Sequence, residues 1–228
     1  MLLYTAPILT FKKVIKEGSV GEFSCIPYIL TLFTSLTYMW YSFPVVSSGW
    51  ENLTLFIINI IGVNFEIAFI SIYLWYAPNG KKKFVVVMVS SILAIFSITV
   101  LLSSIVMHTH HIRKLFVGSI GMVAGMSMYS SPLVAVKQVL RTKSVEFMPF
   151  NLSLFSFLAS LIWLVYGILG RDPYIMLPNC VGCLAGILQL AVYCIYRRCK
   201  EASKLNDTEQ TKNVQVATSH MYASTHKP

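Results

Sequence analysis

Charged residues are scarce along this chain, and acidic residues are the scarcest. Only 12% of the 228 residues are charged, and Asp and Glu number 9 against 18 Lys and Arg. A soluble globular domain carries about 25% charged residues, so this composition excludes an ordinary water-soluble fold. The apolar share of 56% and the mean hydropathy of +0.68 indicate a protein that is embedded in a membrane.

The sequence also lacks the patterns of catalytic and metal centres. It contains no glycine-rich phosphate loop, no nucleophile–base pair and no paired catalytic carboxylates, so we expect neither enzyme activity nor a cofactor. Cys180 and Cys183 are spaced as on one turn of a membrane helix, and the cysteines show no disulfide framework. His108, His110 and His111 fall in a predicted loop, where we favour solvation and expect no metal.

The basic residues stand at the ends of apolar segments, as membrane anchors do. The net charge of +9 therefore gives no reason to expect a nucleic-acid partner.

Long apolar runs predict seven membrane crossings. They cover roughly residues 1–15, 26–46, 53–76, 84–107, 115–138, 150–169 and 174–196. About 20 apolar residues cross the ~30 Å hydrocarbon layer as a helix, so we predict an all-α polytopic membrane protein in contact with lipid. Residues 200–228 are polar and typical of a disordered cytosolic tail.

Lysine and arginine are divided unequally between the two sets of loops. Twelve lie in one set, and only Arg113, Lys114 and Arg171 lie in the other. Because basic loops remain in the cytosol, we expect the C-terminus inside and the N-terminus outside. The plasma membrane is favoured over an internal membrane such as that of the vacuole. Asn52-Leu53-Thr54 would then face outward and make Asn52 a candidate glycan acceptor.

An internal repeat organises the chain. The stretch "YTAPILTFKKVIKEGSVGEFSCIPY" (4–28) matches "YSSPLVAVKQVLRTKSVEFMPF" (129–150). The corresponding pairs are Tyr4 and Tyr129, Pro7 and Pro132, Pro27 and Pro149, Tyr38 and Trp163, Tyr41 and Tyr166, and Asn59 and Asn179. We predict a seven-helix 3+1+3 parallel repeat: a first three-helix unit (1–76), a linking helix with its loops (77–114), a second unit (115–199) and the tail (200–228).

The two copies differ at their beginnings. About fourteen apolar and small residues precede Tyr129 in the second copy, whereas three precede Tyr4. Fifteen helical residues reach only about 22 Å, so the first helix is expected to be shortened at its outer end.

The repeated prolines are candidate hinges. Pro7, Pro27, Pro132 and Pro149 recur at equivalent places toward the cytosolic ends of their helices. A proline removes a backbone hydrogen bond and bends a helix, although ordinary helix starts would also explain Pro27 and Pro149.

A pair of amides and a pair of aromatic residues are candidate substrate ligands. Asn59 and Asn179 stand within apolar segments, where an amide offers donors and an acceptor to a hydroxyl-rich ligand or serves as interhelical packing. Tyr38 and Trp163 could flank the same cavity and present ring faces to the C–H side of a sugar, or they could face lipid.

The remaining candidates are acidic residues and tyrosines. Glu66 is the only carboxylate deep in a span and is either a proton or cation site or a protonated packing residue. Tyr41, Tyr166 and Asp172 fall near the outer face, where hydroxyl–carboxylate hydrogen bonds could close a gate. An interfacial aromatic belt also explains the tyrosines.

These landmarks resemble the SWEET (MtN3/saliva) family of sugar transporters, and its plant branch most closely. The resemblance covers about residues 1–198 and is most specific in "EFSCIPY" (22–28), "TKSVEFMPF" (142–150) and "YGILGRDPYIMLPN" (166–179). It implies a facilitative sugar transporter with no cofactor.

The resemblance also assigns roles to residues. It implies that the four prolines form the inner gate and that Asn59, Asn179 and Trp163 bind the sugar. It further implies that Tyr41, Tyr166 and Asp172 form the outer gate. Tyr38 replaces a residue that is usually small in the family, and the bulk of Tyr38 and Trp163 favours a hexose over a disaccharide.

Two other functions stay open on the sequence alone. One is a proton-coupled carrier of another polar solute that uses Glu66. The other is a shortened, non-transporting partner that assembles with full-length relatives and modulates them. As partners we expect the sugar substrate and the surrounding lipid, with a homo- or hetero-oligomer of relatives also open.

Overall fold

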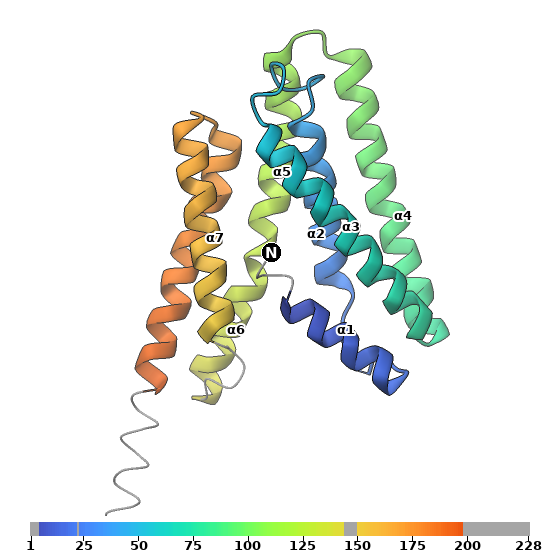
Figure 1. Ribbon diagram of the computed structural model, residues 1–228, viewed down its shortest axis with the longest axis vertical. Helices are drawn as coiled ribbons and strands as arrows, with labels where there is room; N and C mark the ends of the chain where they lie inside the picture. The colour runs from blue at the N-terminus through green and yellow to red at the C-terminus, as the bar shows by residue number, and fades with distance from the viewer. Residues whose placement is uncertain (1–4, 22, 144–149, 198–228) are drawn as a thin grey trace, which may run out of the picture.

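The computed structural model describes residues 5–21, 23–143 and 150–197, and within these ranges every regular element is a helix (Figure 1). The helices are α1 (Thr5–Glu17), α2 (Ile26–Tyr41), α3 (Leu53–Tyr76), α4 (Asn79–Leu101), α5 (His110–Met128), α6 (Ser130–Thr142), α7 (Phe150–Leu169) and a last helix, Pro173–Arg197. In the described part of the chain, five helical spans are long and apolar enough to cross a membrane, with α5 and α6 counted as one. The predicted all-α membrane architecture is confirmed.

Some helix boundaries differ from those predicted. The helix α5 begins at His110, so His110 and His111 lie on a helix, and the prediction that they lie in a loop was wrong. The physical reason is the N-cap of α5, where the Thr109 side chain accepts a hydrogen bond from the N–H of Ile112 at 3.4 Å. The prediction relied on runs of apolar residues, which do not reveal such a cap. Similarly, α4 begins at Asn79 and carries Lys81 in its first turn.

The crossing formed by α5 and α6 is interrupted at Tyr129. Pro132 is the third residue of α6, and it has no N–H to donate to the carbonyl of Met128, so the helical hydrogen-bond ladder is broken there. Pro7 is likewise the third residue of α1. The helix α1 has 13 residues, whereas the span formed by α5 and α6 has 33.

The first three helices share one apolar core with α4. The ring of Phe11 in α1 stacks on Phe69 in α3 with centroids 4.8 Å apart, and the edge of Tyr28 in α2 meets both rings. Buried Val85 and Ile92 add the linking helix α4 to this core. Figure 1 shows α1 to α4 gathered on one side, with α7 and the last helix on the other.

Glycines bring the two sides of the bundle into close contact. A Cβ atom at Gly121 of α5 would lie 3.4 Å from the Tyr38 ring of α2, and one at Gly125 would lie 3.3 Å from Pro178 of the last helix. Small residues let helix backbones approach in this way. An apolar cluster at the same level includes Val117 of α5 and Ile175 of the last helix, both fully or nearly fully buried.

The backbones of α7 and the last helix approach each other closely at Gly167. A Cβ atom there would lie 2.7 Å from the backbone nitrogen of Met176, and the N–H of Asp172 donates to the Gly167 carbonyl at 2.9 Å. Because a backbone atom cannot rotate away, even one added methyl group would force the two helices apart.

We expect Gly167→Ala to destabilise the protein by about 1–3 kcal/mol, because overpacking displaces backbone at this contact. The measurement is the apparent Tm of purified protein in detergent. Gly80→Ala is the matched control, since a Cβ atom at Gly80 meets nothing within 4 Å. Equal Tm values for the two variants would contradict the close-packing role of Gly167.

Candidate functional site

A cavity of about 320 Å³, the central cavity, lies between the two sides of the bundle. All the residues predicted to bind substrate line it: Tyr38 of α2, Asn59 of α3, Trp163 of α7 and Asn179 of the last helix. The structure therefore brings together side chains that the sequence spaces more than a hundred residues apart. Their role as ligands stays a prediction.

The amides of Asn59 and Asn179 are held in the same way. The Nδ2 atom of Asn59 donates to the Leu55 carbonyl at 2.8 Å, and that of Asn179 donates to the Ile175 carbonyl at 2.7 Å. Each bond uses one of the two N–H groups and fixes the amide plane against its own helix. The carbonyl oxygen and the second N–H of each amide are then left for a ligand in the cavity.

The aromatic residues of the central cavity are anchored by other tyrosines. The hydroxyl of Tyr38 donates to the backbone carbonyl of Tyr174 at 2.9 Å, which links α2 to the last helix. Trp163 meets Tyr166 edge to face, with centroids 5.4 Å apart and planes at 80°. The Tyr38 ring is therefore a fixed part of the cavity wall.

Sequence reasoning missed four polar members of this wall, Thr34, Tyr129, Ser156 and Ser160, and two of them, Tyr129 and Ser160, contact each other. Their side-chain oxygens lie 3.3 Å apart and share a hydrogen bond. The available signal was the repeat, because Tyr129 corresponds to Tyr4, which lies outside the described residues. No sequence signal distinguished Ser160 from the other serines of α7.

At one end of the bundle, which we call the Asp172 end, a tyrosine joins the two sides. The hydroxyl of Tyr41 in α2 donates to Oδ2 of Asp172 at 2.6 Å, and the Tyr41 side chain is 0% exposed. The other carboxylate oxygen of Asp172 accepts the N–H of Tyr174 at 3.1 Å. This buried, charge-assisted bond connects residues that the resemblance assigns to the outer gate.

A second hydrogen bond also joins the two sides, but here the tyrosine belongs to the second repeat and its partner to the first. The hydroxyl of Tyr166 in α7 donates to Oδ1 of Asn52 at 3.3 Å. Asn52 stands directly before α3, as Asp172 stands directly before the last helix. Tyr41 with Asp172 and Tyr166 with Asn52 are therefore equivalent pairs, and we call them the crossed tyrosine pairs.

The predicted glycan acceptor, Asn52, is buried in this arrangement, and its glycosylation stays a prediction. Asn52 is 6% exposed, and its Nδ2 atom, where a glycan would attach, donates to Oγ of Ser47 at 3.2 Å. A sequon is read from three neighbouring residues, whereas burial depends on the tertiary fold. In this structure Asn52 is a partner of Tyr166, a role that sequence reasoning missed.

The loop that carries Asn52 is tied to the start of α5. Glu51 forms an ion pair with Lys114, and Arg113 donates through Nη1 to the Val45 carbonyl at 2.8 Å. Partial burial acts to raise the pKa of Glu51, but hydrogen bonds from Lys114 and the Ser48 N–H outweigh it and leave the pKa below its ordinary value. The Lys114 ammonium also lies 6.0 Å from the centroid of the Tyr41 ring.

A larger cavity of about 710 Å³, the lower cavity, shares part of its wall with the central cavity and runs from Thr54 and Tyr166, near the Asp172 end, toward the opposite end. Pro7 and Pro27 line it, together with Glu66. Pro132 lies in the first turn of α6, and Pro149 lies outside the described residues. The predicted hinge role of the four prolines stays a prediction.

Glu66 is an isolated acid in this wall. Its side chain is 3% exposed, and Oε2 has no hydrogen-bond partner in the described part of the protein. Among the described residues, no group of His, Cys, Asp and Glu side chains is arranged to hold a metal ion.

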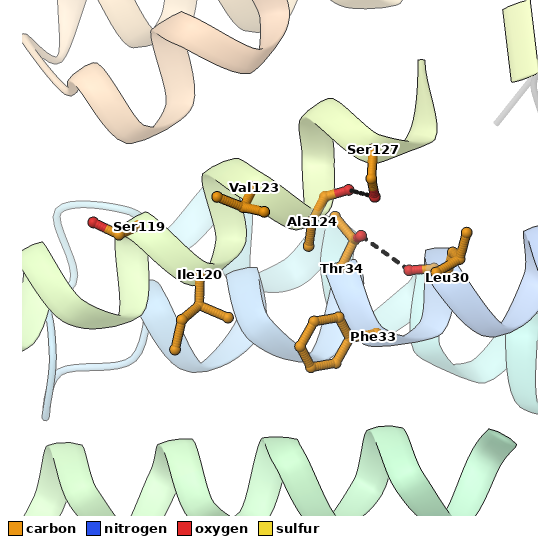
Figure 2. A pocket seen from close by; sticks show the side chains of 8 residues that line it. All are labelled: Leu30, Phe33, Thr34, Ser119, Ile120, Val123, Ala124 and Ser127. Carbon is orange, nitrogen blue, oxygen red and sulfur yellow. Dashed lines mark hydrogen bonds between the residues drawn. The ribbon is translucent and has the colours of Figure 1, made fainter. Parts of the chain in front are cut away.

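A third cavity, between α2 and α5, has a different character (Figure 2). Its wall is mainly apolar, with Phe33 and Ile120 among its members. The hydroxyl of Thr34 donates to the Leu30 carbonyl at 2.9 Å, and that of Ser127 donates to the Ala124 carbonyl at 2.7 Å. Both hydroxyls donate to carbonyls of their own helices. This cavity therefore offers a hydrophilic ligand fewer hydrogen-bond donors than the central cavity does.

Comparison with known proteins identifies the family of this chain. A family model described as "Sugar efflux transporter for intercellular exchange" (MtN3_slv) matches residues 1–83 and 115–201. Bidirectional sugar transporter SWEET3a of Oryza sativa subsp. japonica is 64% identical over 100% of this chain and 93% of its own length. SWEET3b of the same plant is 62% identical over 96% of this chain and 88% of its own length.

A solved structure is also similar. The 3.7 Å resolution structure of a eukaryotic SWEET transporter matches with a TM-score of 0.80 and 34% identity, over 86% of this chain and 90% of that one. With the family model covering most of the chain and relatives above 60% identity, the chain belongs to the MtN3/saliva (SWEET) family.

Proposed function

We propose that this chain is a facilitative, bidirectional sugar transporter that works by alternating access. The observation that carries the proposal is the central cavity, where equivalent amides from the two repeats and a tryptophan ring converge. Relatives of high identity are named bidirectional sugar transporters, which supports the same substrate class here.

The polar groups of the central cavity suit a sugar. Asn59 and Asn179 each offer a carbonyl oxygen that can accept from a sugar hydroxyl and an N–H that can donate to one. The face of Trp163 packs against the apolar C–H side of the ring. A ligand bound between the repeats contacts both of them, so its binding couples to their relative movement.

The crossed tyrosine pairs serve as the gate at the Asp172 end. They hold the repeats together there, and the hydroxyls must release Asp172 and Asn52 before that end can open. Hinge bending at the four prolines would open and close the other end. A sugar would thereby meet each side of the membrane in turn.

We further propose that the Asp172 end faces outside and that the C-terminus is cytosolic. The distribution of lysine and arginine between the loops supports this orientation. The family description, which refers to intercellular exchange, supports the plasma membrane as the location.

A hexose is the favoured substrate. The central cavity of about 320 Å³ lies at the lower end of the ~300–1,000 Å³ that small-molecule sites occupy. Tyr38, whose hydroxyl donates to the Tyr174 carbonyl, adds bulk to the wall of the central cavity, which favours one sugar ring over two.

We expect Asn179→Ala to reduce glucose uptake into proteoliposomes at least ~10-fold, because the loss of a buried hydrogen bond to a ligand costs more than 1 kcal/mol. The control is Asn64→Ala. Asn64 makes the same bond to its own helix, from Nδ2 to the Ile60 carbonyl at 2.8 Å, but it is exposed on α3 and lines neither cavity. Unchanged uptake by Asn179→Ala at equal protein content would remove its binding role.

We expect wild-type protein to take up labelled glucose faster than labelled sucrose, and Tyr38→Ser to raise the ratio of sucrose to glucose uptake. The control, Tyr38→Phe, loses the bond to Tyr174 but keeps the ring, and should retain the preference for glucose. Faster entry of sucrose than of glucose in the wild type would overturn the hexose assignment.

A further inference from the structure

The buried carboxyl group of Glu66 destabilises the fold, because no hydrogen bond from the described residues compensates for the burial of Oε2. Its carboxyl group is buried in α3 with Oε2 unpartnered, and a buried polar atom without a hydrogen bond destabilises a protein by about 1–3 kcal/mol. Such atoms are uncommon in folded proteins and call for a specific explanation. An acid in a membrane span is a candidate for function for the same reason.

The Glu66 carboxyl group has no cationic partner among the described residues. The ion pairs found there involve other acids, Glu17 and Glu51. A buried carboxyl group without a partner is costly, so a ligand that hydrogen-bonds to it would be stabilising.

Glu66 also stands beside the path that a solute would follow. The lower cavity, which it lines, shares four wall residues with the central cavity: Ile58, Met128, Ala159 and Trp163. The lower cavity also contains Thr31, whose hydroxyl donates to the Pro27 carbonyl and keeps its lone pairs as acceptors. The wall of the lower cavity thus carries both the carboxyl group of Glu66 and the hydroxyl of Thr31.

We propose that Glu66 is a second sugar-binding residue, which hydrogen-bonds sugar hydroxyls in the lower cavity as the sugar moves between the central cavity and the proline end. The proposal rests on the proposed function. When the Glu66 side chain turns toward the lower cavity, Oε2 can form a hydrogen bond with a sugar hydroxyl and so compensate for the water that the sugar has lost. Glu66 thus lowers the stability of the fold but makes the movement of the sugar between the cavities easier.

The test compares Glu66→Met with Glu66→Gln in proteoliposome uptake of labelled glucose and in apparent Tm. Methionine has similar length and no group that hydrogen-bonds strongly, whereas glutamine keeps a donor and an acceptor. We expect Glu66→Met to slow uptake at least tenfold while its Tm equals or exceeds that of the wild type. We expect Glu66→Gln to stay within threefold of the wild-type rate. Asn64→Met is the matched control on the same helix and should transport normally.

The proposal is overturned if Glu66→Met transports like the wild type, if Glu66→Gln is as slow as Glu66→Met, or if Glu66→Met lowers the Tm. The last result would assign Glu66 to packing. Glucose-induced proton entry that disappears in Glu66→Gln would also overturn it, in favour of proton coupling. If wild-type protein moves no sugar, the proposed function fails first, which is distinguishable from a defect confined to the Glu66 variants.

Discussion

The crossed tyrosine pairs are the constraint on which the rest of the arrangement depends. Tyr41 reaches from the first repeat to Asp172 of the second, and Tyr166 reaches from the second repeat to Asn52 of the first. Hydrogen bonds to charged groups contribute about 1.5–3 kcal/mol and neutral ones about 1 kcal/mol. Together they supply only a few kcal/mol, which is enough to favour one closed state and small enough for a carrier to open.

Other features of the Asp172 end support these pairs. The ion pair of Glu51 with Lys114 holds the loop that carries Asn52, and the close approach of α7 to the last helix at Gly167 fixes Asp172. Between the repeats, the central cavity and the lower cavity share part of their walls. The proposed alternating access requires a state in which the crossed tyrosine pairs hold the Asp172 end together, and their hydrogen bonds are present here.

The features that could be predicted from the sequence are those that occur in both repeats. Asn59 and Asn179 could be paired because equivalent residues of a duplicated unit occupy equivalent places, and both line one cavity. The contact of Asn52 with Tyr166 could not be predicted from its sequon, because a sequon is local, whereas burial against Tyr166 arises only when the repeats meet. The cap at Thr109, which starts α5 at His110, depends on one side-chain bond that hydropathy does not detect. The contact of Ser160 with Tyr129 likewise required the tertiary arrangement.

The most direct test of the gate is the distance between the repeats at the Asp172 end. Spin labels at Trp50 and Arg171, both exposed, would report it by double electron–electron resonance on a background without native cysteines. We expect a short distance in the wild type and a second, longer distance that gains population when Tyr41→Phe and Tyr166→Phe are combined. A single distance distribution, unchanged by these substitutions and by glucose, would contradict alternating access through this gate.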